Sequence, residues 1–288
     1  GLDFTREYIL KLGIIFLGIQ LKPFEFLDFG KIAIPLIIVC ILSVLIVIKL
    51  IIKKLKIPTR MAYLISIGST VCGTTAIMAT APIIKANKNE ISYAIANITL
   101  FGILSMLLYP YFANIYFNGE PLLIGLFLGT SIHETSQVAA AGLIYEQQFN
   151  SPETLNIATV TKLIRNTFLI IMIPLFALLY NRGQTKEKNY SILKIFPYFV
   201  VGFVGMIILR NLGDEIYGSN SNWIEIINNI KLFSKIFLTM AMAAIGLSTN
   251  LKDIKNMGYK PFIVGFIAML TVGIVCIITI ESYLRFFI

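Results

Sequence analysis

GLFLGTSIHETSQVAAAG, residues 125–142, decides which fold class this chain can adopt. The stretch lies within a segment whose length and apolar flanks are typical of a membrane helix. It nevertheless contains His133, the one histidine of the chain, directly followed by Glu134. Ionisable side chains are costly in a bilayer and normally face a cavity or a partner group. The stretch therefore predicts a polar interruption of a membrane segment.

The composition of the whole chain is that of an integral membrane protein. Of its 288 residues, 57% are hydrophobic and 14% are charged, and the mean hydropathy is +0.82. Soluble domains carry about 25% charged residues. The apolar runs have helical length and lack the alternation of membrane barrel strands. We therefore expect an all-α transmembrane bundle that forms a single domain over residues 1–288. The net charge of +9 lies mainly between apolar runs, which favours membrane topology over nucleic-acid binding.

The apolar segments predict about nine spans, each near the ~20 residues that a crossing requires. They lie at about 8–21, 32–52, 61–84, 91–117, 121–145, 156–180, 193–210, 231–248 and 260–284. If all of them cross, the positive-inside rule places the N-terminus in the cytoplasm and Ile288 outside. A re-entrant segment would reverse the side of everything after it.

A pair of similar motifs predicts an inverted repeat. Residues 17–19 are followed by residues 28–30 in the same way as residues 245–247 are followed by residues 256–258, with equal spacing between the glycines. The first and eighth spans would cross in opposite directions, as in transporters with inverted repeats. A chance match of a common helix–Gly–turn–helix pattern is the alternative.

Two of the predicted spans are interrupted by small and hydroxyl residues. The third contains GSTVCGTTA at residues 68–76, and the fifth contains the stretch at 125–142. Such residues either let helices pack closely or allow a helix to break and to present backbone N–H and C=O groups to a ligand. Two runs favour paired broken helices that line a site. Asn97 and Thr99, in the intervening span, could face the same cavity or join helices.

The sixth span carries Lys162, Arg165 and Asn166 on one helical face, at positions i, i+3 and i+4. Their long stems could carry the two charges back to the membrane interface. Otherwise both cations are candidate anion ligands, and Glu134 is a candidate partner.

Enzymatic chemistry is poorly supported by these residues. The stretch from His133 to Gln137 stops one residue short of a His-Glu-x-x-His zinc motif, and the chain has no second histidine. Ser131 is two residues from His133, a spacing that turns the side chains apart on a helix. The chain also lacks a phosphate-binding Gly-rich Lys loop. We therefore expect no enzymatic activity, no metal and no cofactor.

Four motifs, in this order, resemble those of one family. They are GSTVCGTTAI at 68–77, GTSIHETSQVAAAG at 129–142, KLIRN at 162–166 and AAIGLSTN at 243–250. The chain is similar over nearly its whole length to the YeiH-type membrane proteins of bacteria, a family named for sulfate export. The resemblance implies a multi-pass protein of the bacterial inner membrane. It also implies a distant relation to cation–proton antiporters and bile-acid symporters, and helices ahead of Gly1 that this chain lacks.

One feature conflicts with the crossing of broken helices that this superfamily shows. The two interrupted spans are separated by a single span, so they would run parallel if all three cross, whereas an inverted crossing pair must be antiparallel. Three explanations are open: the fifth segment is re-entrant, the seventh or eighth span supplies the counterpart, or a boundary is wrong.

These features favour a secondary transporter that moves a small anion, sulfate-like or sulfonate-like, by alternating access. Export is the direction that the family name implies. We expect the anion at mid-membrane, held by helix N-termini. Lys162 and Arg165 would supply positive charge, and His133 and Glu134 would carry a coupled proton. The residues predicted to form the site are Gly73, Thr74, Thr75, His133, Glu134, Ser136, Gln137, Lys162, Arg165 and Asn166.

Two alternatives stay open. One is a sodium-coupled organic-acid transporter, in which backbone carbonyls and Glu134 hold the sodium ion. The other is a non-transporting membrane partner or sensor. The expected partners are the anion, a coupling proton or sodium ion and the lipid bilayer, without nucleic acid. A homodimer is compatible with the sequence, which does not define the oligomeric state.

Overall fold

The computed structural model describes residues 1–20, 23–55, 57–81, 83–86, 88–169, 171–172, 175–176, 198–218, 220–248 and 259–283. Every regular element among these residues is a helix, so the all-α prediction is confirmed.

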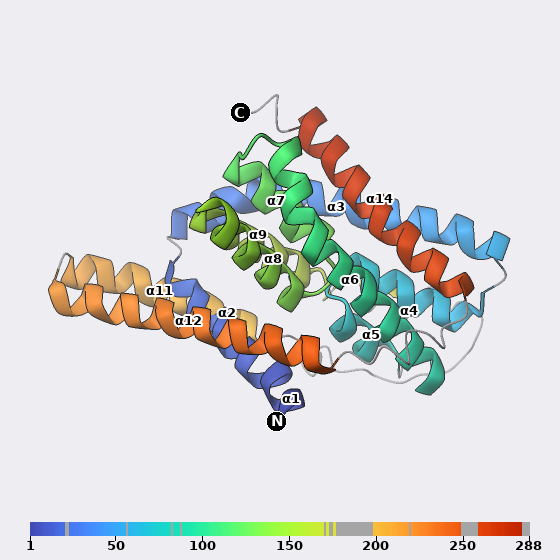
Figure 1. Ribbon diagram of the computed structural model, residues 1–288, viewed down its shortest axis with the longest axis horizontal. Coiled ribbons are helices and arrows are strands. Elements are labelled where there is room, and N and C mark those ends of the chain that lie inside the picture. The colour runs from blue at the N-terminus through green and yellow to red at the C-terminus, as the bar shows by residue number, and fades with distance from the viewer. Residues whose placement is uncertain are drawn as a thin grey trace.

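The helices form two groups (Figure 1). The larger group, here called the core bundle, comprises α3 (Pro23–Leu55), α4 (Thr59–Thr70), α5 (Thr74–Thr80), α6 (Lys88–Tyr116), α7 (Pro121–Ser131), α8 (Thr135–Phe149), α9 (Pro152–Thr167) and α14 (Tyr259–Tyr283). The smaller group, here called the side bundle, comprises α1 (Leu2–Phe4), a π-helical turn (Thr5–Ile9), α2 (Leu10–Leu17), a 3₁₀ turn (Gly18–Gln20), α11 (Tyr198–Tyr217) and α12 (Ser221–Ser248).

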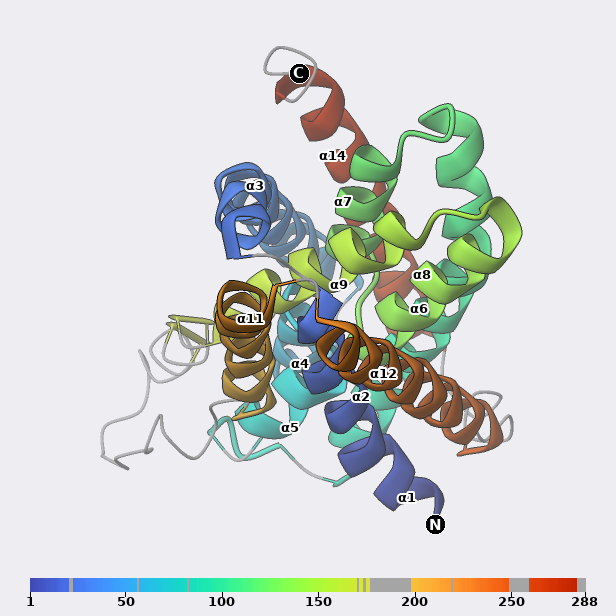
Figure 2. The same ribbon diagram turned by 90° about the vertical axis from the view of Figure 1, so that its left-hand side faces the viewer.

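The side bundle packs α2 against both α11 and α12, and Figure 2 shows this group beside the core bundle. The two bundles touch chiefly where α12 meets α8, with a smaller contact between α11 and α3. An ion pair crosses the larger contact, because the Lys235 ammonium on α12 lies 2.5 Å from a carboxylate oxygen of Glu146 on α8. The described parts of the two bundles are therefore joined at few places.

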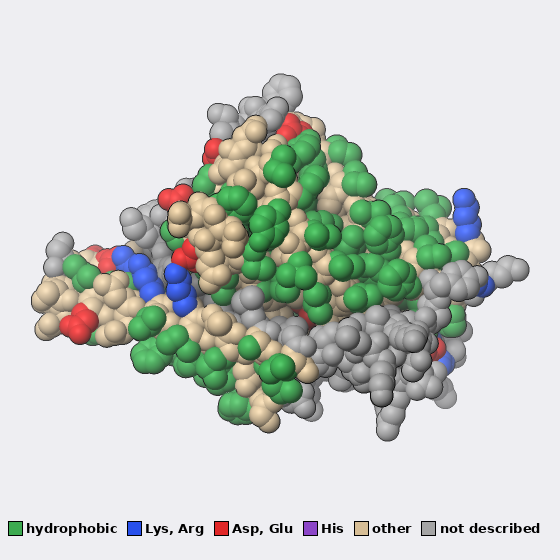
Figure 3. Space-filling model, in the orientation of Figure 1, with side chains coloured by type: hydrophobic (Ala, Val, Ile, Leu, Met, Phe, Trp, Pro, Cys, Tyr) green, Lys and Arg blue, Asp and Glu red, His purple; other side chains and the backbone are tan. Residues whose placement is uncertain are grey.

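Three helices of the core bundle are long and apolar enough to cross a membrane. These segments are Gly30–Ile51, Glu90–Tyr116 and Lys260–Tyr283. They expose large apolar side chains, including Leu42, Leu108 and Ile278, and Figure 3 shows hydrophobic side chains covering much of this face. Such a surface suits contact with lipid. The described residues thus support three of the about nine predicted spans by length and composition, and the number nine is not confirmed.

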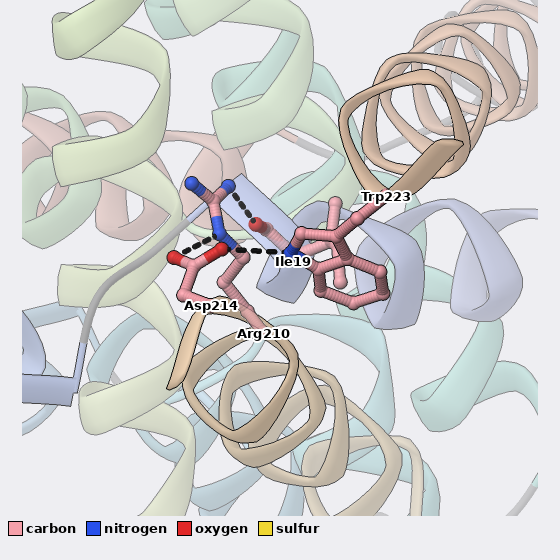
Figure 4. A network of polar contacts seen from close by, with 4 residues as sticks. All are labelled: Ile19, Arg210, Asp214 and Trp223. Atoms are coloured by element: carbon pink, nitrogen blue, oxygen red, sulfur yellow. Dashed lines mark hydrogen bonds and ion pairs between the residues drawn. The ribbon is translucent and has the colours of Figure 1, made fainter. Parts of the chain in front are cut away.

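A network of polar contacts holds the two long helices of the side bundle to the 3₁₀ turn that follows α2 (Figure 4). Arg210 forms an ion pair with Asp214 at 2.7 Å and donates a hydrogen bond to the carbonyl oxygen of Ile19. The indole N–H of Trp223 donates to the other carboxylate oxygen of Asp214. Trp223 is buried between helices, and Gly213 leaves room for its ring. The network fixes α11, α12 and α2 as one unit.

The interrupted segment at 121–145 is a helical hairpin, as the register against α9 shows. On α7, a Cβ atom at Gly125 would lie 2.5 Å from Ile157, and one at Gly129 would lie 2.6 Å from Thr161. The residue numbers of the two helices rise together. Therefore α7 and α9 run parallel.

The pairs formed by α8 show the opposite order. Asn166 donates a hydrogen bond of 3.0 Å to Thr135, at the start of α8, whereas a Cβ atom at Gly142 would lie 2.7 Å from Leu155. Numbers rise on α8 while they fall on α9, so these helices are antiparallel. Since α7 is parallel to α9 and α8 is antiparallel to it, α8 returns toward the side from which α7 enters.

This hairpin decides among the explanations that the sequence left open. The segment at 121–145 is re-entrant, because its two halves run in opposite directions. The predicted position of Ile288, which lies outside the described residues, assumed nine crossings and loses that support. The predicted inverted repeat is not tested, because residues 249–258 of its second copy also lie outside the described part. The single-domain assignment stays a prediction.

Candidate functional site

Both predicted interruptions exist, and each separates two short helices. Helix α4 ends at Thr70, and α5 begins at Thr74 after Gly73, whose φ of 65° is in the left-handed region that favours glycine. Helix α7 ends at Ser131, and α8 begins at Thr135. In each break three residues leave the helical conformation. The N–H groups of Val71, Gly73 and Ile132 keep backbone hydrogen bonds, whereas carbonyl groups without a helical partner can bind side chains or a ligand.

The two interruptions lie against each other. The backbone N–H of Thr74 donates a hydrogen bond of 3.3 Å to the Glu134 carboxylate. A Cβ atom at Gly73 would lie 2.4 Å from Cγ of Glu134, which is too close for any side chain. From the sequence we predicted that the run around Gly73 pairs with the polar stretch at 125–142. These contacts confirm that the two runs face each other.

Lys162 of α9 joins the two interruptions. Its ammonium group donates to the carbonyl oxygens of Val71 at 2.9 Å, Ile132 at 2.9 Å and His133 at 2.6 Å. Three hydrogen bonds use every N–H donor that a lysine has. The side chain is completely buried, so it does not carry its charge to the membrane interface.

Arg165, one turn further along α9, makes a second set of bonds of the same kind. Its guanidinium donates to the carbonyl oxygens of Thr70 at 2.9 Å and Ile132 at 3.1 Å, and also to those of Ser69 and Thr130. These carbonyls are at the C-terminal ends of α4 and α7, where the helix dipole is negative and carbonyl groups lack helical partners. The two buried cations therefore neutralise and connect two helix ends.

Gln137 joins helices rather than lining an open space. Its amide nitrogen donates to the carbonyl oxygen of Thr99 on α6, and its amide oxygen lies against the Cα atom of Gly102, one turn further on. Asn97 of α6 makes the same pair of contacts with α14, through the carbonyl oxygen of Pro261 and the Cα atom of Gly265. Each amide thus links two helices, and in both cases a glycine leaves room for the amide oxygen, which has no hydrogen-bond donor in the described structure.

The remaining predicted residues divide by accessibility. His133 and Asn166 are buried, and neither the ring nitrogens of His133 nor the amide oxygen of Asn166 has a hydrogen-bond partner in the described structure. Ser136 is also buried. The place where the two interruptions meet is here called the crossing. Thr75 is exposed and Thr74 is half-buried, so the crossing has an accessible edge on their side.

Some contributors were not visible in the sequence. Thr135, the first residue of α8, is half-buried beside the crossing, and its hydroxyl oxygen accepts the hydrogen bond from Asn166. The carbonyl groups that bind Lys162 and Arg165 belong to the backbone, which residue types do not reveal. Among the residues that the structure describes, no group of three or more His, Cys, Asp or Glu side chains is arranged to hold a metal ion.

Together, the fold and the crossing define a helical membrane protein in which two interrupted segments meet around buried cations. The family model described as Conserved hypothetical protein 698 matches residues 1–265. The chain is 35% identical over 286 residues to the UPF0324 membrane protein FN0533 of Fusobacterium nucleatum, covering 96% of this chain and 82% of that protein. It is 36% identical over 276 residues to the UPF0324 membrane protein SAG1125 of Streptococcus agalactiae, with 96% and 80% covered.

The chain therefore belongs to the UPF0324 family of membrane proteins. This result confirms the YeiH-type family assignment made from the four sequence motifs. A UPF0324 membrane protein of Clostridium tetani is 32% identical over 289 residues. No solved structure is significantly similar to the chain.

Proposed function

We propose that this chain is a secondary transporter of a small anion in the bacterial plasma membrane, and that the anion binds where the two interruptions meet. The observation that carries the proposal is the charge at the crossing. Lys162 and Arg165 bring two positive charges into the protein interior, and Glu134 brings one negative charge. The formal charges of the described side chains that meet there thus sum to +1. An anion would neutralise it.

Hydrogen-bond donors beside these charges suit an oxyanion. Helix α8 has 15 residues, and its positive N-terminal end is at the crossing. The Thr135 hydroxyl accepts its hydrogen bond from Asn166, so its own proton can be donated to a ligand. Thr74 and Thr75 place two more hydroxyl groups at the accessible edge. Sulfate, sulfite and sulfonates present the oxygen atoms that such donors bind.

The division into two bundles provides a way to alternate access. The crossing belongs to the core bundle. The side bundle touches the core bundle at few places in the described structure. Movement of one bundle against the other would expose the crossing first on one side of the membrane and then on the other. In this proposal Glu134 carries the coupled proton, because its carboxylate is the acidic group that contacts both interruptions.

A ligand screen by thermal shift tests this proposal. The purified protein is heated with sulfate, sulfite, methanesulfonate or acetate at constant ionic strength, with sodium or with potassium as the counter-ion. We expect one of the sulfur oxyanions to raise the melting temperature with either counter-ion. Stabilisation by acetate that requires sodium would favour the organic-acid alternative. No effect of any anion would contradict the proposed site.

A further inference from the structure

The carbonyl oxygens of Val71, Ile132 and His133 surround the ammonium group of Lys162, and this set is here called the carbonyl cage. We propose that the carbonyl cage is a monovalent-cation site whose occupant is tethered to the protein. The three oxygen atoms lie 2.6 to 2.9 Å from Nζ, and the side chain is completely buried. A site of this kind binds a compact positive charge by its oxygen atoms alone.

The origin of the three oxygens explains their affinity for a cation. Val71 follows α4 and Ile132 follows α7, so both carbonyls lie at the negative ends of half-helices. In transporters with interrupted helices, unwound carbonyls and half-helix C-termini are the groups that coordinate a coupling sodium ion. The lysine ammonium is likewise a compact point charge, without the planar arrangement of donors that an arginine has. It occupies here the position that a free ion would take.

Arg165 completes the arrangement. It binds the carbonyls of Ser69, Thr70 and Thr130, which lie beside the carbonyl cage, so both helix ends are neutralised by side chains. It also donates to the carbonyl oxygen of Ile132, which it shares with Lys162. This inference rests on the proposed function in one respect: it concerns which ion is coupled to the proposed anion transport. A sodium ion held by these carbonyls would have to displace Lys162. The protein therefore needs no coupling sodium at this position.

Removal of the tethered ammonium should create a site for free cations. Lys162→Ala deletes four heavy atoms, Cγ, Cδ, Cε and Nζ, and n-propylammonium supplies the same four. We expect the variant to melt lower than the wild type in choline chloride. Sodium chloride or n-propylammonium chloride should then raise its melting temperature by about 2–4 °C at several times the dissociation constant.

The matched control is Lys235→Ala, which removes a half-exposed lysine outside the carbonyl cage. We expect this variant and the wild type to melt at the same temperature in choline, sodium or n-propylammonium chloride. If Lys162→Ala cannot be purified in a folded state, Lys162→Gln replaces it, because its shorter side chain keeps an amide NH₂ group near the carbonyls. This variant is then tested with sodium.

The two outcomes are distinct. A cation-dependent rise in the Lys162 variant, absent from the wild type and from Lys235→Ala, supports the tethered-cation site. An equal response of the Lys162 variant and the wild type to sodium and n-propylammonium overturns it. The readout is the stability of the purified protein, so it does not depend on transport. Failure of the anion proposal would appear in the ligand screen and would leave this result unchanged.

Discussion

Gly73 is a residue at which the two interruptions touch. Its positive φ sets the turn between α4 and α5, and its missing side chain lets Glu134 lie against the backbone. Only glycine satisfies both conditions, since another residue would add backbone strain and a collision at the same atom. Glycine is therefore required at position 73 by the backbone conformation and the available space, and not by a chemical group that it supplies.

Gly73→Ala should destabilise the protein by about 2 kcal/mol or more, from the φ penalty and the contact with Glu134 together. Thermal unfolding measures the loss. Gly119→Ala is the matched control, because Gly119 has a φ of 77° but meets only Asn114, at 3.7 Å. This control should lose about 1 kcal/mol, from the backbone alone. Equal losses in the two variants would show that the contact with Glu134 is not tight.

Glu134→Gln should separate anion transport from the proton gradient. The amide can still accept the hydrogen bond from Thr74, so the crossing should keep its shape, but the side chain no longer carries a proton. In proteoliposomes we expect anion flux to lose its response to an imposed pH difference. Thr75→Ser, which keeps the hydroxyl at the exposed edge, should respond as the wild type does. An unchanged pH response in Glu134→Gln would remove Glu134 from the coupling mechanism.

Among the elements, α7 and α8 show how far sequence patterns reach. The apolar length of residues 121–145 equals that of one span, and a span and a hairpin of two half-length helices have the same composition. The polar residues from Ser131 to Glu134 correctly predict the interruption. They cannot indicate whether the chain continues or turns back, because that depends on the packing of α9 against both halves through Gly125, Gly129 and Gly142.

The site was predictable to a similar extent. The two interruptions and the candidate cations Lys162 and Arg165 were found from residue types and spacing, because charged and helix-breaking residues are rare in membrane segments. That the two cations are buried was left open by the sequence and comes from the structure. Their partners were not found, since carbonyl groups are present at every position. Gln137 was predicted as a ligand, but its contacts with Thr99 and Gly102 are between helices, which a sequence cannot distinguish from a contact with substrate.

The contact between α6 and α8 gives a prediction at this scale. Gly102→Ala would place a Cβ atom 1.9 Å from the Gln137 amide oxygen, so the amide must move. We expect a loss of about 1–3 kcal/mol for Gly102→Ala and about 0.6–1.7 kcal/mol for Gln137→Ala. The double variant should lose less than the sum, because the alanine at 137 leaves room for the new methyl group. Additive losses in thermal unfolding would mean that the two residues do not meet.

At the scale of the whole molecule, the proposed transport mechanism requires the two bundles to move relative to each other. The ion pair between Lys235 and Glu146 crosses their main contact, and it is partly exposed, so it contributes little to stability. The distance between these two side chains does, however, report how far α12 lies from α8. A movement that opens the contact must separate these two side chains.

A covalent link at this contact should therefore stop transport. In Glu146→Cys combined with Lys235→Cys, a short thiol-specific cross-linker should reduce anion flux at least about tenfold, and a reductant should restore it if the linker contains a disulfide. The three native cysteines are buried, so the wild type treated in the same way is the background control. Full flux in the cross-linked protein would show that this contact does not open.

Flux of a labelled anion through Thr135→Val tests the central claim most directly. Valine keeps the branched shape of threonine but removes the hydroxyl group that faces the crossing. The buried Asn166 amide then loses its acceptor, so the variant should lose about 1–3 kcal/mol of stability, and thermal unfolding checks that it is still folded in the assay. In proteoliposomes we predict saturable uptake of labelled sulfate or sulfite by the wild type, and a Michaelis constant at least about tenfold higher for Thr135→Val. The same Michaelis constant in both proteins, or no uptake by the wild type, would contradict an anion site at the crossing.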